Sequence, residues 1–306
     1  MGKTRFSIGC DPEFFLRERK SGKLISAIPH IMGTKHDPQP LKCGNIQRDN
    51  VAVEVATDPA NSVEMFVNNI NTLLSEATKT LPKDTEIVAL PSACFDEDQL
   101  TDPEALMFGC DPDYCAWDLI QNDPPCASDH TFRSCGAHIH VGTNGTDGND
   151  FLLDPMGKVR MIRVMDCIHG IISTILDSSE ESIARRKLYG KPGAHRAKEY
   201  GVEYRVLSNY WLKSPTTVML MYYLTQDALD VMVSGKDSEL VDELGEQEIR
   251  NTIMNGDSAL AKKMFENTVS KLLSEDSMHY FKLACEKIEV NDMNFHNEWK
   301  LYKEAT

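Results

Sequence analysis

The sequence predicts an α+β protein whose helices gather toward the C-terminus. Strand-like segments that carry polar pairs lie in the first two thirds of the chain, whereas apolar residues recur at helical spacing over residues 157–176 and 217–233. From about residue 238 to 288 the chain is amphipathic and helical. The length of 306 residues allows two domains, but enzymes of this size often have one continuous core. We expect a catalytic domain over residues 1–235, with residues 236–306 as a helical extension packed on it.

The first elements follow from period-two runs and turn residues. Residues 5–17 are predicted to form a long strand, and residues 24–28 a short one after a Lys-Ser-Gly-Lys turn. The Pro- and Gly-rich stretch 33–44 is expected to be a loop, and the strand pattern resumes over residues 51–56. Ser62 precedes an apolar stripe with helical spacing, so it is expected to cap a helix.

Three pairs of ligand-capable residues, each two positions apart, distinguish the strand-like segments. They are Asp11 and Glu13, His138 and His140, and Glu203 and Arg205. Residues i and i+2 of a strand project from the same face of a sheet, which would ordinarily carry apolar side chains. Glu54 joins this set because it lies inside a Val-Ala-Val-Glu-Val run. The pattern predicts a metal and anion site on a sheet.

Each pair alone is more commonly structural. A His-x-His pair is usually two half-exposed histidines, Asp-Pro-Glu is usually a strand entry, and Glu-Tyr-Arg is usually a cross-strand pair at the surface. The coincidence of all three pairs in one chain favours the site.

Charge narrows the classes of partner. A net charge of −15 disfavours binding to nucleic acid or to an anionic membrane. Within residues 185–205, however, seven basic residues face only two acidic ones, which gives this segment a net charge of +5. A solvated basic loop is the ordinary explanation, but the segment ends in Glu203, Tyr204 and Arg205, which favours anion binding.

The composition also suggests a compartment. The N-terminus has no apolar signal-peptide core, no apolar run approaches the ~20 residues of a membrane span, and the nine cysteines include no CxxC pair. We expect a cytoplasmic protein with reduced thiols.

The donor types indicate which ligands fit. Carboxylates with a minor share of imidazole suit Mg²⁺ or Mn²⁺ better than Zn²⁺. Such ions usually share a phosphate ligand, and guanidinium groups bind phosphate oxygens in pairs. A nucleotide with a divalent metal is therefore the expected ligand.

The ordered motifs resemble a known group of enzymes. Asp-Pro-Glu-Phe-Phe-Leu from residue 11, Glu54, Gly-Ala-His-Ile-His-Val-Gly from residue 136, and a basic loop that ends in Glu-Tyr-Arg are similar to the glutamine synthetase and glutamate-cysteine ligase superfamily. Within it, the basic stretch 185–191 and residues 209–212 resemble phage-encoded carboxylate-amine ligases (amidoligases) of type 2. The resemblance covers residues 9 to about 212. It implies a curved, mostly antiparallel sheet that carries the active site and is backed by helices, as in glutamine synthetase catalytic domains.

The resemblance also implies roles for single residues. The implied metal ligands are Asp11, Glu13, Glu54, His138 and Glu203. The implied nucleotide-binding residues are His138, Arg185, Arg186, Lys187, Lys191, Arg196 and Arg205, with Arg205 and Arg185 acting on the transferred phosphate. His140 is expected to bind substrate. Asp49 is the candidate base for the amine, and it stands where the family's second middle acid is not cleanly matched.

The function implied is an ATP- and Mg²⁺- or Mn²⁺-dependent ligase that forms an amide or peptide bond through an acyl phosphate. Its substrates would be a small-molecule or peptide carboxylate and an amine, and a phage-encoded enzyme would act in the host cytoplasm. Two alternatives stay open: a metal-dependent hydrolase that activates water with His138 and His140, and an inactive phage structural or interaction protein with a ligase fold. Oligomerisation is left open.

Overall fold

The computed structural model describes residues 6–107, 112–124, 129–145, 150–289 and 294–301. Its main feature is a sheet of eleven described strands in the order β3-β4-β5-β1-β11-β13-β12-β8-β9, with β2 and β6 paired to β1 as well. Every pairing between these strands is antiparallel, so the predicted α+β class with a mostly antiparallel sheet is confirmed.

The strands follow in chain order. They are β1 (Phe6–Glu18), β2 (Leu24–Ile25), β3 (Gln39–Leu41), β4 (Gly44–Asp49), β5 (Ala52–Thr57), β6 (Thr85–Val88), β7 (Ser92–Cys94), β8 (Tyr114–Cys115), β9 (Ile120–Gln121), β10 (Phe132–Ser134), β11 (Ala137–Thr143), β12 (Ala194–Lys198) and β13 (Gly201–Tyr204). β7 and β10 form a separate two-stranded sheet. The expected loop over residues 33–44 is thus wrong in part, because β3 and the start of β4 form a hairpin there.

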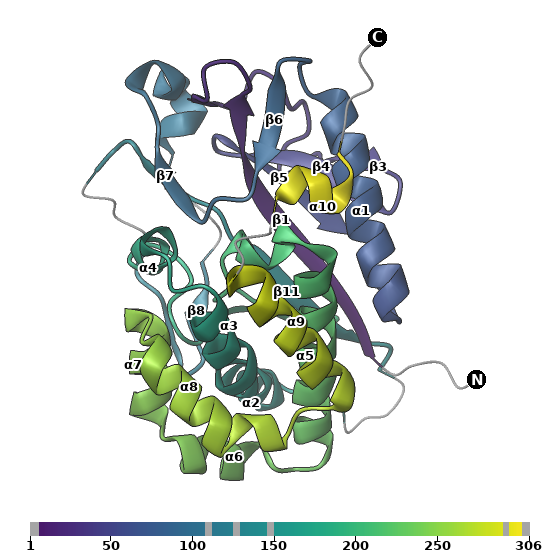
Figure 1. Ribbon diagram of the computed structural model, residues 1–306, viewed down its shortest axis with the longest axis vertical. Helices are drawn as coiled ribbons and strands as arrows, with labels where there is room; N and C mark the ends of the chain where they lie inside the picture. The colour runs from purple at the N-terminus through teal and green to yellow at the C-terminus, as the bar shows by residue number, and fades with distance from the viewer. Residues whose placement is uncertain (1–5, 108–111, 125–128, 146–149, 290–293, 302–306) are drawn as a thin grey trace.

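Helices cover the apolar face of the main sheet (Figure 1). The helices are α1 (Val63–Thr80), α2 (Pro155–Met165), α3 (Ile171–Leu176), α4 (Glu180–Arg186), α5 (Pro215–Val233), α6 (Asp237–Leu244), α7 (Glu246–Asn255), α8 (Ser258–Asn267), α9 (Glu275–Glu289) and α10 (Phe295–Trp299). Figure 1 shows α1 and the group α2, α3, α5 and α9 along the length of β1. Ser62 caps α1 as expected, since its hydroxyl accepts a hydrogen bond from the Met65 amide.

The two faces of β1 carry different side chains, because successive residues of a strand point to opposite sides of the sheet. Ile8, Cys10 and Phe14 lie in the main apolar core under the helices, whereas Asp11 and Glu13 project from the opposite face. The sheet therefore separates a helical core from a polar face. Among the described residues, no helix is both long enough and apolar enough to cross a bilayer.

The helix expected over residues 157–176 is interrupted. A π-helical turn, Asp166–Gly170, separates α2 from α3 and buries the Asp166 carboxylate completely. Trp117 Nε1 donates to Asp166 Oδ2 at 2.7 Å, and the Tyr204 hydroxyl donates to Asp166 Oδ1 at 2.8 Å. Since Tyr204 stands between Glu203 and Arg205, Asp166 anchors the end of β13 from behind.

We expect Asp166 to give the stability a measurable pH dependence. Burial raises the pKa of Asp166 to about 7, although the hydrogen bonds from Trp117 and Tyr204 act in the opposite direction. Its unfolded pKa is near 4, so between about pH 4 and 7 the folded state binds the extra proton. Protonation of Asp166 therefore stabilises the folded state fully below about pH 4, and this contribution is lost as the pH rises to 7. The free energy of unfolding falls by about 4 kcal/mol at most over this range.

The measurement is the free energy of unfolding in urea from pH 4.5 to 7.5. The neutral variant Asp166→Asn is destabilised overall, because its amide has one oxygen acceptor for the two donors, Trp117 and Tyr204. Its stability profile nevertheless lacks this slope, because asparagine does not titrate. Parallel profiles for the wild type and the variant would contradict the assignment.

Candidate active site

The strand register brings the polar pairs to one face of the sheet. The directly opposed residues are Asp11 with His138, Glu13 with Glu54, and His140 with Glu203. Directly opposed residues of an antiparallel pair point to the same face. Four adjacent strands, β5, β1, β11 and β13, thus present a continuous row of carboxylates and imidazoles.

One group in this row has the spacing of a metal site. Ligand atoms of Asp11, His140 and Glu203 all lie within 4.8 Å of one another. His140 Nε2 is 3.2 Å from Asp11 Oδ2, so the residue expected to bind substrate lies with two expected metal ligands. Asp11 Oδ1 is buried and lies 3.0 Å from His138 Nδ1. A divalent cation would satisfy these donor atoms, so the group fits Mg²⁺ or Mn²⁺.

His138 lies between the acids and the cations of the site. Its Nδ1 is 3.0 Å from Asp11 Oδ1 and 3.2 Å from Arg205 Nη1. Burial lowers the pKa of His138 to about 4, and the charge of Arg205 acts in the same direction. The imidazole is therefore neutral at physiological pH, as metal ligation requires.

A second acidic group lies beside the first. Glu13, Asp49 and Glu54 line a small cavity together with Asp11 and His138. Burial raises the pKa of Glu13 to about 8, with the charge of Asp49 adding to the effect. Burial also raises the pKa of Glu54 well above its ordinary value, helped by the charges of Asp11 and Asp49. These carboxylates oppose each other's ionisation, and a divalent cation would remove that cost.

Cations surround the buried end of β13. Lys198 Nζ lies 2.7 Å from Glu203 Oε2, Arg196 Nη1 lies 3.4 Å from Glu203 Oε1, and Arg205 Nη1 donates to the same oxygen. Burial and the charge of Asp11 disfavour ionisation of Glu203, but Arg205 and the two imidazoles lower its pKa to about 2. Glu203 is therefore a fixed negative charge at the centre of the cationic group.

The other basic residues of the 185–205 segment lie in different parts of the structure. Arg185 is buried and lines a cavity with Glu13 and His138. Arg186 is also buried, but its guanidinium lies by Gly256 at the end of α7, among the helices. Lys187 is exposed and Lys191 is half-buried. The structure thus brings Arg185, Arg196 and Arg205 to the polar face and directs Arg186 away from it.

Two site residues received no individual role from the sequence, although Lys198 was counted among the basic residues of the 185–205 segment. Lys198 lies two positions from Arg196 on β12, so the period-two rule used for the other pairs would have found it. Asp113 Oδ2 lies 3.4 Å from Arg205 Nε. This contact depends on the pairing of β8 with β12, which no local pattern predicts.

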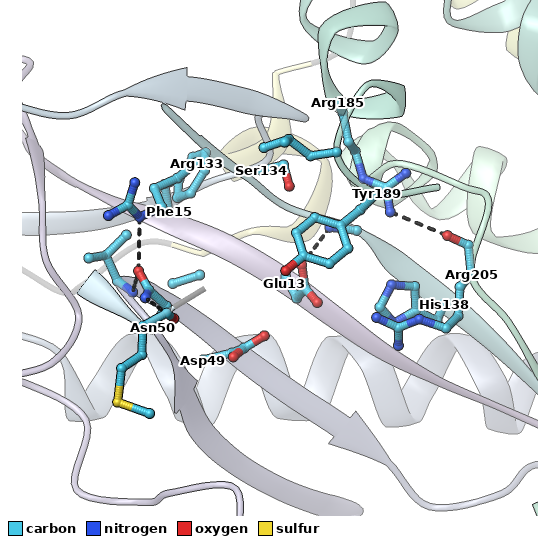
Figure 2. Close-up of a pocket in the computed structure, with 15 residues that line it drawn as sticks. Glu13, Phe15, Asp49, Asn50, Arg133, Ser134, His138, Arg185, Tyr189 and Arg205 are labelled. Carbon is cyan, nitrogen blue, oxygen red and sulfur yellow. Dashed lines mark hydrogen bonds between the residues drawn. The ribbon is translucent and has the colours of Figure 1, made fainter. Parts of the chain in front are cut away.

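A larger cavity opens beside the second acidic group, and we call it the Glu13 cavity. Its lining is Glu13, Phe15, Asp49, Asn50, Val51, Ala52, Met107, Arg133, Ser134, Gly136, His138, Arg185, Leu188, Tyr189 and Arg205. Figure 2 shows Arg133 and Asn50 at one end of it and His138 and Arg205 at the other, with Glu13 between them. The cavity therefore connects the charged face to a second region of the molecule.

Comparisons with known proteins agree with the motifs. The model of the family described as Phage phiEco32-like COOH.NH2 ligase-type 2 matches residues 129–300, more than half of the chain. The match includes the C-terminal helices, where the sequence showed no signature, and leaves out the first two acidic strands. No curated protein matches the sequence.

Two solved structures are similar over most of this chain. A bifunctional glutathione synthetase from Pasteurella multocida has 13% identity and a TM-score of 0.39, over 96% of this chain and 54% of its own. A glutamine synthase homolog has 11% identity and a TM-score of 0.37, over 94% of this chain and 71% of its own. The chain thus spans about half the length of the glutathione synthetase.

Proposed function

The chain belongs to the family described as Phage phiEco32-like COOH.NH2 ligase-type 2, and from this premise we propose that it is an ATP- and divalent-metal-dependent ligase that joins a carboxylate to an amine. The family membership confirms the family expected from the motifs. The proposed reaction passes through an acyl phosphate and ends in an amide or peptide bond. The observation that carries the proposal is the adjacency, on one sheet face, of buried metal-ligand groups and phosphate-binding cations.

The acidic row has the donors to hold the metal. Asp11, His140 and Glu203 would hold one ion, with His138 beside them, and Glu13 and Glu54 supply oxygen donors for another. A bound divalent cation would offset the negative charge of the nucleotide phosphates. His140 therefore joins the proposed metal ligands, in place of the substrate contact expected for it.

The cations act on the other side of Glu203. Arg205, Arg196 and Lys198 are held against Glu203, so their positions are fixed before substrate arrives. From there they can stabilise negative charge that builds up on a transferred phosphoryl group. Such fixed donors stabilise the transition state more than flexible ones, because little reorganisation remains.

Asp49 is the proposed base for the amine. It lines both the acidic cavity and the Glu13 cavity, and burial raises its pKa above the ordinary value. A carboxylate with a raised pKa is a better proton acceptor near neutral pH than an exposed one. The amine would therefore lose its proton where the two cavities meet.

The test is release of ADP by the full chain with Mg²⁺, ATP, a panel of carboxylic acids and hydroxylamine as a general amine. An acyl phosphate intermediate predicts a hydroxamate for each acid that drives ADP release. Hydrolysis of amides without any requirement for ATP would instead favour the metal-dependent hydrolase. Absence of both activities, with intact metal binding, would favour the inactive alternative.

A further inference from the structure

We propose that the activated carboxylate belongs to an acid with an uncharged, apolar body, held in the Glu13 cavity with its carboxyl group toward Arg185. The inference rests on the proposed function and adds the substrate class to it. Three features of the cavity carry it: a buried guanidinium at the inner end, an apolar wall, and an outer end whose polar groups are already engaged.

Arg185 provides the carboxylate-binding group. Its side chain is only 1% exposed and lines the cavity. Its Nη1 donates to the carbonyl of Val206 at 2.9 Å and its Nη2 to the carbonyl of Arg205 at 3.4 Å, and both acceptors are neutral. Its buried Nε makes no hydrogen bond. A carboxylate would supply the missing acceptor and neutralise a buried charge.

The wall beyond Glu13 is apolar. Phe15 follows Glu13 by two residues on β1, so both face the same side of the sheet. Phe15, Val51 and Ala52 belong to a second apolar cluster, separate from the main core, and all three line the cavity. Leu188 and Met107 complete this wall. A hydrocarbon group here would remove about 25 cal/mol of unfavourable hydration per Å² buried.

The polar side chains at the outer end of the cavity, Arg133 and Asn50, are hydrogen-bonded within the protein. The Arg133 guanidinium donates to the carbonyls of Ala105, His130 and Phe132 and to the Asn50 side-chain oxygen. The Asn50 amide in turn donates to the carbonyls of three residues between 104 and 107. Arg133 thus donates four hydrogen bonds, whereas Arg185 donates two and keeps a buried Nε without an acceptor. A second carboxylate at Arg133 would have to displace one of these bonds beside apolar side chains, at a high desolvation cost. The cavity therefore selects against dicarboxylic acids.

The experiment compares 4-methylpentanoate with glutarate, using the full chain, ATP, Mg²⁺ and hydroxylamine. We expect kcat/KM for hydroxamate formation to be at least tenfold higher with 4-methylpentanoate. Equal or higher values with glutarate would overturn the inference while leaving the ligase function intact. Binding of both acids without ATP, measured by calorimetry, tests the same preference independently of turnover. ADP release with no acid at all would count against the proposed function, and the binding preference would still decide the inference.

A charge placed on the wall gives a second test with a matched control. Met107 lines the cavity but is 70% exposed, so Met107→Lys leaves the fold unstrained and adds a cation for a distal carboxylate. We expect the ratio of kcat/KM values to shift at least fivefold toward glutarate. Met32 is 81% exposed and lies outside the lining, so Met32→Lys should leave the ratio unchanged. Leu188→Lys should shift it in the same direction as Met107→Lys, and an unchanged ratio in both wall variants would overturn the inference.

Discussion

Replacing Glu203 with glutamine is expected to abolish metal-dependent ADP release, with a loss of about a hundredfold or more. The carboxylate is fully buried, lies in the candidate metal group, and is the shared partner of Arg196, Lys198 and Arg205. A neutral amide of the same shape would remove one metal ligand and leave three cations facing each other without their counter-charge. Both effects act on the same step, so we expect kcat to fall together with metal affinity.

The measurement is ADP release at saturating ATP and increasing Mg²⁺, with Mn²⁺ binding followed by electron paramagnetic resonance. Glu199→Gln is the matched control, because Glu199 is exposed in the turn that joins β12 to β13. It removes one negative charge four residues away without touching the cations. Unchanged release in Glu203→Gln, or an equal loss in the control, would refute the role of Glu203.

The period-two rule explains why the sheet face was predictable. Asp11 and Glu13, His138 and His140, and Glu203 each reach the polar face by strand alternation alone. The rule says which residues share a face, but it does not say which strands are neighbours or in what register. The grouping of His140 with Asp11 and Glu203 depends on the register between β1, β11 and β13. The sequence therefore predicted that His140 lies on the polar face, but it did not predict that Asp11 and Glu203 are its neighbours there.

The sequence predicted where the helices lie along the chain, but it did not predict the irregularities within them. Apolar spacing identified residues 157–176 as helical, and α2 and α3 do occupy that span. At the π-helical turn, Asp166 accepts hydrogen bonds from Trp117 and Tyr204, which lie far away in sequence. A local pattern contains no information about those partners. The same reason explains Arg186, which shares the basic segment with Arg185 but faces the helices.

Addition of one methyl group at Gly136 is expected to cost nearly as much activity as removal of Arg185. Gly136 donates to Glu13 Oε2 at 2.6 Å through its amide, and its backbone lies against both Arg185 and His138. A Cβ atom at this position would lie 2.5 Å from Arg185 Nη2 and 2.6 Å from His138 Nε2, well inside normal contact distance. The guanidinium and the imidazole must both move away, so Gly136→Ala should lower kcat/KM about a hundredfold.

A double-mutant cycle separates this displacement from simple destabilisation. If the methyl group acts mainly by displacing Arg185, then Gly136→Ala costs less activity once Arg185 has been replaced by alanine, because only the close approach to His138 remains. The two losses are then less than additive. Unfolding in urea gives the matching stability cycle, in which the clash with the Arg185 guanidinium is relieved in the double variant. Additive losses in kcat/KM would instead place the effect at His138 or in the backbone bond to Glu13. Non-additivity would show that the glycine of the Gly-Ala-His-Ile-His-Val-Gly motif holds open the space in which the guanidinium meets the substrate.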